Sequence, residues 1–210
     1  MNIPAFVRRN LQTILNLALF GALGYGAAYR AYHAWLAKDL NLVEAAFFTH
    51  NVILLLVILI RREHVAIDRD LVHQAIALFA FMTGIAFDEK PTVSNALFLN
   101  MSRGVTLLAL TLGTISLVNL GRSFGILISL RKVKTTGLYS VIRHPMYATD
   151  IVWRLGFILQ NASAFNLVLM AASTGAYVYR ALLEEEFLKQ FAEYREYMQR
   201  VRHRFIPGVF

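Results

Sequence analysis

Apolar residues along the chain gather in long blocks that short polar or charged segments separate. The four longest blocks cover residues 11–29, 42–60, about 71–87 and about 105–120. Each comes close to the ~20 apolar residues that an α-helix needs to cross the hydrocarbon core of a bilayer. The pattern therefore predicts transmembrane helices.

Two shorter apolar segments follow, over residues 147–159 and 165–179, and a polar link at 160–163 joins them. They predict a helical hairpin, although each half is short for a full span and a re-entrant pair fits the pattern too. With the hairpin included, the sequence predicts an all-α integral membrane protein with about five to six transmembrane helices.

The last segment predicts an amphipathic helix on the cytoplasmic side. Its apolar residues recur every three or four positions and so share one helical face, which consists of Phe187, Phe191, Tyr194, Met198 and Val201. Charged and amide side chains cover the opposite face. Such a helix either lies on the anionic leaflet or folds back as a lid over the membrane-embedded part.

Composition excludes several classes of protein. Hydrophobic residues make up 57% of the 210 positions and charged residues 16%, against roughly 45–50% and about 25% in ordinary soluble domains. A water-soluble single domain is excluded. The absence of cysteine from the sequence also excludes thiolate nucleophiles, thiolate-ligated zinc and iron–sulfur clusters.

The net charge of +8 is explained by topology rather than by nucleic-acid binding, because the basic residues lie between the apolar blocks. With both termini in the cytoplasm, sixteen of the 21 Lys and Arg residues fall on the cytoplasmic side, as the positive-inside rule requires. This orientation places the long polar segments 121–145 and 180–210 on that same side. We expect any polar cofactor site there.

The segment 136–147 holds the most informative group of polar residues. Gly137 permits a backbone turn, and Pro145 suits the first turn of the following helix, which would leave nearby N–H groups free for an anionic ligand. Arg143 and His144 would stand beside those donors. The alternative is an interfacial Arg and Tyr that only anchor a helix end.

Ionisable residues also occur within or next to the hairpin. Arg180 and Glu184 are four positions apart, and the run 184–186 places three carboxylates where the last apolar segment ends. Carboxylates at that depth need solvent, a cationic partner or a ligand's donors. Asp150 and Arg154 can pair along one helical face, as a functional group or simply as a self-neutralising pair.

His50 and His73 lie in two different apolar blocks, so haem ligation between helices is conceivable. No supporting motif accompanies them, and ordinary hydrogen-bonded histidines are the favoured interpretation. We predict no metal site. The sequence also has no phosphate-binding P-loop, and the glycines at 121 and 125 do not form a dinucleotide-binding fingerprint.

Several of these residues form motifs that occur in a fixed order. The motifs are Leu120-Gly121-Arg122, Thr136-Gly137-Leu138-Tyr139, Arg143-His144-Pro145-x-Tyr147, Arg180-x-x-x-Glu184-Glu185-x-x-Leu188 and Tyr194-x-x-Tyr197. Over about the last ninety residues the chain resembles the isoprenylcysteine carboxyl methyltransferase family. Phosphatidylethanolamine methyltransferases are more distant relatives.

The resemblance implies a membrane methyltransferase that uses S-adenosylmethionine and takes a lipophilic or lipidated acceptor, similar to an isoprenylcysteine carboxylate, from the bilayer. Residues 1–100 would then supply N-terminal transmembrane helices, and 101–210 the catalytic core. The resemblance assigns Arg143 and Glu185 as catalytic residues. The cofactor would contact Tyr139, His144, Pro145, Tyr147, Arg180, Glu184 and Glu185.

One departure from the family keeps a second enzyme class open. Asp150 completes an Arg-His-Pro-x-Tyr-x-x-Asp pattern that also resembles sterol reductases, which use NADPH. The chain is short for such a reductase, and Glu184-Glu185 fits the methyltransferases. A third alternative is a non-catalytic or haem-binding membrane protein. The acceptor could be a lipid-like thiol, amine or carboxylate, and membrane lipids are the other expected partners.

Overall fold

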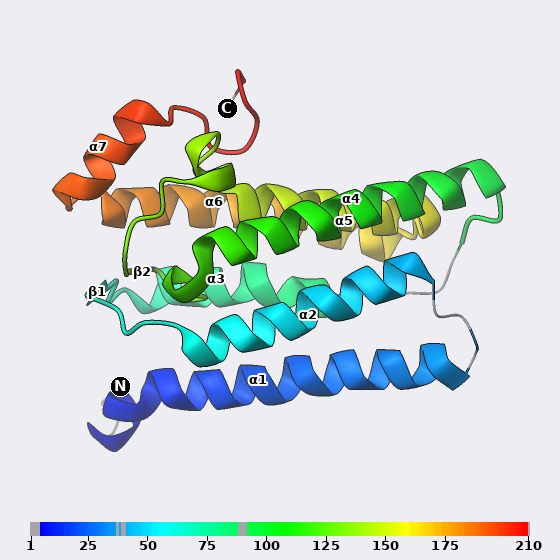
Figure 1. The fold of residues 1–210 in the computed structure, drawn as a ribbon, viewed down its shortest axis with the longest axis horizontal. Helices are drawn as coiled ribbons and strands as arrows, with labels where there is room; N and C mark the ends of the chain where they lie inside the picture. The colour runs from blue at the N-terminus through cyan, green and yellow to red at the C-terminus, as the bar shows by residue number, and fades with distance from the viewer. Residues whose placement is uncertain (1–4, 37, 39–40, 88–91, 210) are drawn as a thin grey trace.

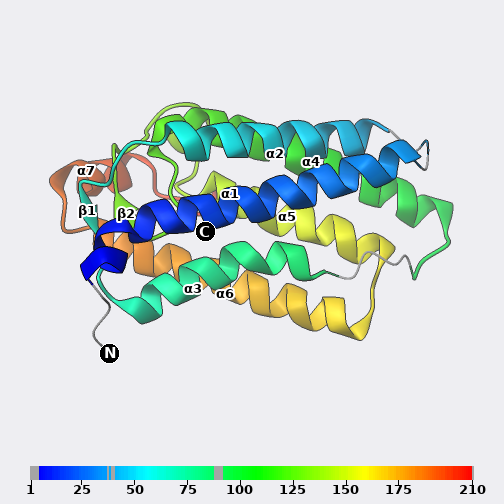
Figure 2. The same ribbon diagram turned by 90° about the horizontal axis from the view of Figure 1, so that it is seen from below.

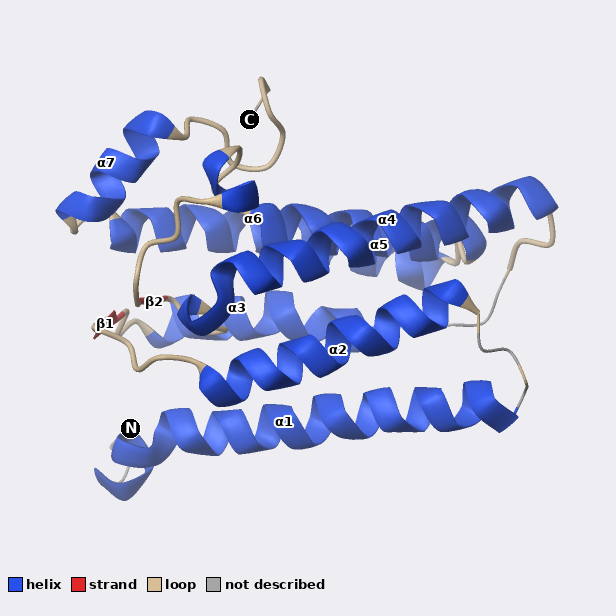
Figure 3. Ribbon diagram, in the orientation of Figure 1, coloured by secondary structure: helices blue, strands red, loops and turns tan. Residues whose placement is uncertain are grey.

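The computed structural model describes residues 5–36, 38, 41–87 and 92–209. Long helices that alternate in direction fill this part of the chain (Figures 1 and 3). They are α1 (Ala5–Leu36), α2 (Leu42–Ile60), α3 (Leu71–Met82), α4 (Ala96–Leu120), α5 (Pro145–Gln160) and α6 (Ala164–Leu188), followed by the short α7 (Ala192–Arg200). The predicted all-α class is confirmed.

Short elements connect these helices. The 3-10 turns are η1 (Thr83–Ala86), η2 (Gly121–Ser123) and η3 (Gly137–Ser140). A two-residue antiparallel pair joins β1 (Ala66–Ile67) to β2 (Ser129–Leu130). This pair ties the polar connection after α2 to the polar connection after α4.

Polar side chains set the starts of four helices. Asn41, Asp70, Asn95 and Ser163 each accept a hydrogen bond from a backbone N–H group of the first turn, and they cap α2, α3, α4 and α6. The cap at Asn95 explains why α4 starts nine residues before the apolar block that we identified from about 105. Apolar patterning marks the lipophilic part of a helix, whereas the cap marks its end.

Two helices in the described part of the chain are long and apolar enough to cross a membrane, at Leu42–Ile60 and Ala96–Ser123. Less than a third of the residues in either apolar stretch are buried inside the protein, so most of their side chains are at least partly exposed at its surface. Leu71–Ala86 is a shorter apolar helix. The total of five to six spans stays a prediction.

The two ends of the bundle differ. The start of α1, the β1–β2 pair and α7 lie toward one end, on the left of Figure 1. The turn between α5 and α6 lies at the opposite end (Figure 2). The polar connections after α2, α4 and α6 therefore start at a common end, as the predicted topology requires.

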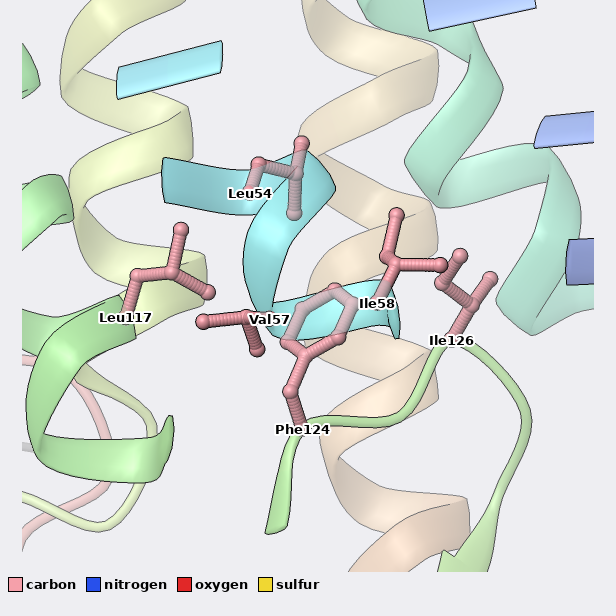
Figure 4. Packing of buried hydrophobic residues seen from close by; sticks show 6 residues of the cluster. All are labelled: Leu54, Val57, Ile58, Leu117, Phe124 and Ile126. Carbon is pink, nitrogen blue, oxygen red and sulfur yellow. The ribbon is translucent and has the colours of Figure 1, made fainter. Parts of the chain in front are cut away.

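Apolar packing fixes the polar segment that follows α4. Leu54, Val57 and Ile58 of α2 and Leu117 of α4 surround Phe124 and Ile126 from this segment (Figure 4). Burying a side chain of this size contributes roughly 1.5–3 kcal/mol. The segment is therefore held against the bundle.

The predicted amphipathic helix is interrupted. α6 continues to Leu188 and includes Phe187, while Phe191 precedes α7 as its N-cap. The predicted continuous helix is wrong because the chain turns between these residues. The apolar residues on both sides of the break nevertheless pack with Leu130 of β2 in one cluster. Its buried members are Leu130, Leu188, Tyr194, Tyr197 and Val201, and Phe187, Phe191 and Met198 lie beside them. This packing favours the fold-back alternative over a helix that rests on lipid.

Candidate active site

A pocket opens where the segment after α4 meets the start of α5, the end of α6 and α7. Among the predicted site residues, Tyr139, Arg143, His144, Tyr147, Arg180 and Glu184 line it. Pro145 and Glu185 lie behind this lining. The structure thus brings together most of the residues that the motifs single out, although they lie up to 45 positions apart in the sequence.

Gly137 forms the predicted turn at the rim of the pocket. Its φ is +63°, in the left-handed region that favours glycine. Asn119 Oδ1 accepts a hydrogen bond from the N–H of Leu138 at 3.0 Å, and a Cβ at Gly137 would collide with the Asn119 amide. The turn is therefore locked to the end of α4, and it places Tyr139 in the pocket.

Pro145 occupies the first turn of α5, as predicted. The expectation of free N–H groups beside it is wrong for Arg143 and His144. Their N–H groups donate to the carbonyl oxygens of His203 and Arg204, both at 2.9 Å. The C-terminal segment satisfies these donors because it pairs with the chain just before α5.

Glu185 is the centre of a buried ionic cluster. Its Oε1 accepts a hydrogen bond from Arg143 Nε at 2.7 Å and lies 3.1 Å from His144 Nε2, while its Oε2 accepts from Arg204 Nε at 3.0 Å. Arg143 Nη1 also donates to the carbonyl oxygens of Val201 and Arg202, at 2.8 and 2.6 Å. The cluster joins α6, the start of α5 and the C-terminal segment.

Glu185 and His144 are both buried in the bundle. They are 1% and 6% exposed. Burial alone would raise the pKa of the Glu185 carboxyl, but the hydrogen bonds from His144 and Arg143 outweigh it and lower the pKa to about 2. Glu185 is therefore ionised and paired in the folded protein.

This shift predicts an acid-sensitive fold. The folded pKa of about 2 lies below the ordinary value of 4.5, so the ionised cluster stabilises the protein above pH ~4.5, and this contribution is lost as the pH falls toward 2. As the pH falls from 4.5 to about 2, we expect the free energy of unfolding to decrease less in the Glu185→Gln variant than in the parent protein. Denaturant unfolding at several pH values in detergent measures this. Parallel pH dependence in the two proteins would contradict it.

Glu184 points into the pocket, in contrast to its neighbour. It accepts a hydrogen bond from the Tyr147 hydroxyl. The Tyr147 ring stacks on the His144 ring, with 5.1 Å between centroids and an angle of 11°. The pocket wall is therefore a carboxylate next to stacked aromatic rings, and of the two glutamates Glu184 is the one that a ligand can reach.

Arg180 stabilises the pocket wall through contacts with several parts of the chain. Its guanidinium lies 4.8 Å from the centroid of the Tyr147 ring, a distance at which a cation and an aromatic face attract. Rather than pairing with Glu184, it donates to the carbonyl oxygens of Ala77 at 2.9 Å and Ile126 at 2.6 Å. Arg180 therefore connects α6 to α3 and to the segment after α4.

The predicted pair of Asp150 and Arg154 forms, with 3.9 Å between Arg154 Nη1 and Asp150 Oδ1. Asp150 also accepts a hydrogen bond from the Tyr177 hydroxyl and lines the pocket. The histidines considered for haem have other partners: His50 Nδ1 lies 3.0 Å from Thr114 Oγ1, and His73 Nδ1 lies 2.7 Å from Asp68 Oδ2. No metal-binding cluster occurs among the residues that the structure describes.

Other pocket residues were missed from the sequence. Arg131, Lys132 and Lys134 line the pocket, although the pattern of basic residues indicated only a place on the cytoplasmic side for them. Their position next to the Gly137 turn was the available clue. Tyr194 and Tyr197 of α7 line it too, and the Tyr197 hydroxyl donates to the carbonyl oxygen of Tyr139 at 2.7 Å. This hydrogen bond holds α7 against this side of the pocket.

Comparisons with known proteins match the part of the chain that builds this pocket. Residues 96–193 match the phospholipid methyltransferase family. Protein-S-isoprenylcysteine O-methyltransferase B of Arabidopsis thaliana is 33% identical over 94 residues, which are 41% of this chain and 48% of that protein. The predicted resemblance to the isoprenylcysteine methyltransferases is confirmed. These matches favour the methyltransferases over the reductase alternative.

A probable protein-S-isoprenylcysteine O-methyltransferase of Oryza sativa subsp. indica is 34% identical over 107 residues, or 45% of this chain and 53% of that protein. The chain thus spans about half the length of these curated relatives. Among solved structures, a eukaryotic intramembrane Ras methyltransferase is 17% identical with a TM-score of 0.47, over 99% of this chain and 88% of that one.

Proposed function

We propose that this chain is an integral membrane methyltransferase that moves a methyl group from S-adenosylmethionine to a lipophilic acceptor. The observation that carries the proposal is the pocket itself. Tyr139, Tyr147 and Glu184 line it, and all three fall within the segment that matches the phospholipid methyltransferase family.

The chemistry of the pocket fits the cofactor. S-adenosylmethionine carries a sulfonium and an ammonium cation, ribose hydroxyls and a carboxylate. Glu184 and the Tyr139 ring suit cations and hydrogen-bond donors. Lys132 and Lys134 at the same pocket suit the carboxylate. When bound, the cofactor supplies an electrophilic methyl group.

The residues of the pocket would hold the cofactor, align it with the acceptor and shield both from water. An in-line methyl transfer requires donor and acceptor at ~3–3.5 Å in fixed orientation and a site without bulk water. Tyr139, His144, Tyr147 and Glu184 would contact the cofactor, and the buried Tyr194 and Tyr197 would exclude water. These tasks require neither a metal nor a covalent nucleophile.

Four predicted site residues act by positioning. Arg143 and Glu185 join the start of α5 to α6 and the C-terminal segment, and Arg180 holds Tyr147 and two backbone segments. Pro145 sets the start of α5. We place this pocket and both termini on the cytoplasmic side, in agreement with the distribution of basic residues.

Calorimetry on the detergent-purified protein tests the cofactor. We expect S-adenosylhomocysteine to bind in the micromolar range, roughly −8 kcal/mol, and NADPH not to bind. Saturable NADPH binding without binding of the methyl-donor product would contradict the methyltransferase proposal.

A further inference from the structure

Three arginines from different segments meet where the two most apolar helices end. Arg61 directly follows α2, Arg122 lies in the η2 turn after α4, and Arg131 follows β2. α2 and the stretch Ala96–Ser123 are the helices long and apolar enough to cross a membrane, and both stop at the end of the bundle that carries the β1–β2 pair (Figure 1). A helix that crosses a bilayer ends at the headgroups, so these arginines lie at that depth.

Backbone hydrogen bonds fix two of these arginines beside the third. Arg122 Nε donates to the carbonyl oxygen of Ile60 at 3.1 Å, and the carbonyl oxygen of Arg122 accepts from the N–H of Arg62 at 2.8 Å. Arg131 Nε donates to the carbonyl oxygen of Arg62 at 3.0 Å. Both side chains are thus held against the short stretch of backbone that carries Arg61.

Within the described part of the chain, no carboxylate forms an ion pair with any of the three arginines. Glu63, two positions after Arg61, is exposed. Burial and the nearby charge of Arg131 lower the pKa of Arg61 to about 10. Burial also lowers the pKa of Arg131, and the charge of Glu184 opposes this only in part. The cations therefore repel each other, and an anion beside them would be attracted.

The cluster also has unused hydrogen-bond donors. Arg61 Nε is buried and has no hydrogen-bond partner among the described residues, which is unfavourable for a buried N–H group. Arg122 uses only its Nε in the contact with α2. A guanidinium group donates two parallel hydrogen bonds to phosphate oxygens. The charge and the donors together fit a phosphate group.

We propose that Arg61, Arg122 and Arg131 bind the phosphate of an anionic phospholipid. Their position at the ends of the apolar helices favours a lipid headgroup over a soluble phosphate, because basic residues next to a membrane-crossing helix attract anionic lipids. Leu59 and Ile60, in the last turn of α2, are exposed and would lie beside the acyl chains of the same lipid.

Lipid binding in a neutral detergent tests this site. Dioleoylphosphatidylglycerol and dioleoylphosphatidylcholine share their acyl chains and the phosphate diester, but choline carries a cation that balances the phosphate charge. We expect the parent protein to bind the phosphatidylglycerol about 10-fold more tightly, since hydrogen bonds to a charged group contribute at least this factor. Native mass spectrometry measures the affinity for the first bound lipid. Inorganic phosphate at the same concentration should not displace it.

Two variants localise the effect. Arg61→Gln removes a cation that does not line the cofactor pocket, and the preference should fall below about 3-fold. Without phosphatidylglycerol this variant should be at least as stable as the parent, because it removes a charge that has no partner in the protein. Arg69→Gln makes the same change of charge at an exposed residue between β1 and α3 and should retain the preference.

Equal binding of the two lipids by the parent would overturn the inference, as would an equal loss of preference in Arg61→Gln and Arg69→Gln. Displacement of the lipid by inorganic phosphate would overturn it too, because the anion would then come from solution. The lipid preference does not depend on S-adenosylhomocysteine, so this test and the test of the cofactor succeed or fail separately.

Discussion

Replacing Arg143 with methionine is expected to lower the free energy of unfolding by about 3 kcal/mol. Removing one partner of a buried ion pair typically costs about 3–5 kcal/mol, because the other charge remains buried. Arg204 and His144 still contact Glu185, which places the expected cost at the lower end. The carbonyl oxygens of Val201 and Arg202 also lose their donor. Denaturant unfolding in detergent measures the change.

Two controls accompany this variant. Combining Arg143→Met with Glu185→Gln removes the buried carboxylate that Arg143→Met leaves with fewer partners, and should recover part of the stability. Lys189→Met breaks the exposed pair with Glu186 and should cost less than about 1 kcal/mol. Equal effects of Arg143→Met and Lys189→Met would mean that the buried cluster does not hold the C-terminal segment.

Replacing Glu184 with glutamine is expected to weaken S-adenosylhomocysteine binding by roughly 10- to 100-fold, because hydrogen bonds to a charged group contribute about 1.5–3 kcal/mol. The fold should remain intact, since Glu184 pairs with the Tyr147 hydroxyl rather than with the buried cluster. Calorimetry gives the affinity, and unfolding of the same sample gives the stability.

Glu186 supplies the matched control for this prediction. Its side chain is 78% exposed and pairs with Lys189 at the surface, so Glu186→Gln should bind S-adenosylhomocysteine with parental affinity. If Glu184→Gln also kept parental affinity, Glu184 would be only the hydrogen-bond partner of Tyr147 and not a cofactor contact.

Much of the helical architecture could be predicted from local signals. The second apolar block coincides with α2 at both ends, because Asn41 caps it and charged residues follow it. Gly137 correctly predicted the turn and Pro145 the start of α5, because their backbone preferences do not depend on tertiary contacts. Asp150 and Arg154 paired as their spacing on one helix predicted.

Features that depend on tertiary contacts could not be predicted. Adjacent carboxylates on a helix point in different directions, so the sequence could not tell that Glu185 enters a buried cluster while Glu184 lines the pocket. Arg180 donates hydrogen bonds to backbone carbonyl oxygens of distant segments. Every residue has such an oxygen, so the residue types of those segments could not predict the contacts. The break after Leu188 was hidden because apolar spacing continues through the turn.

Photo-crosslinking of methyl-labelled S-adenosylmethionine tests the central claim most directly, because it needs no knowledge of the acceptor. The proposed site predicts saturable labelling of the full-length protein that excess S-adenosylhomocysteine abolishes. Peptide mapping should then place the label within residues 131–147 or 184–197. Labelling that does not saturate, or a label confined to other parts of the chain, would contradict the assignment of this pocket as the cofactor site.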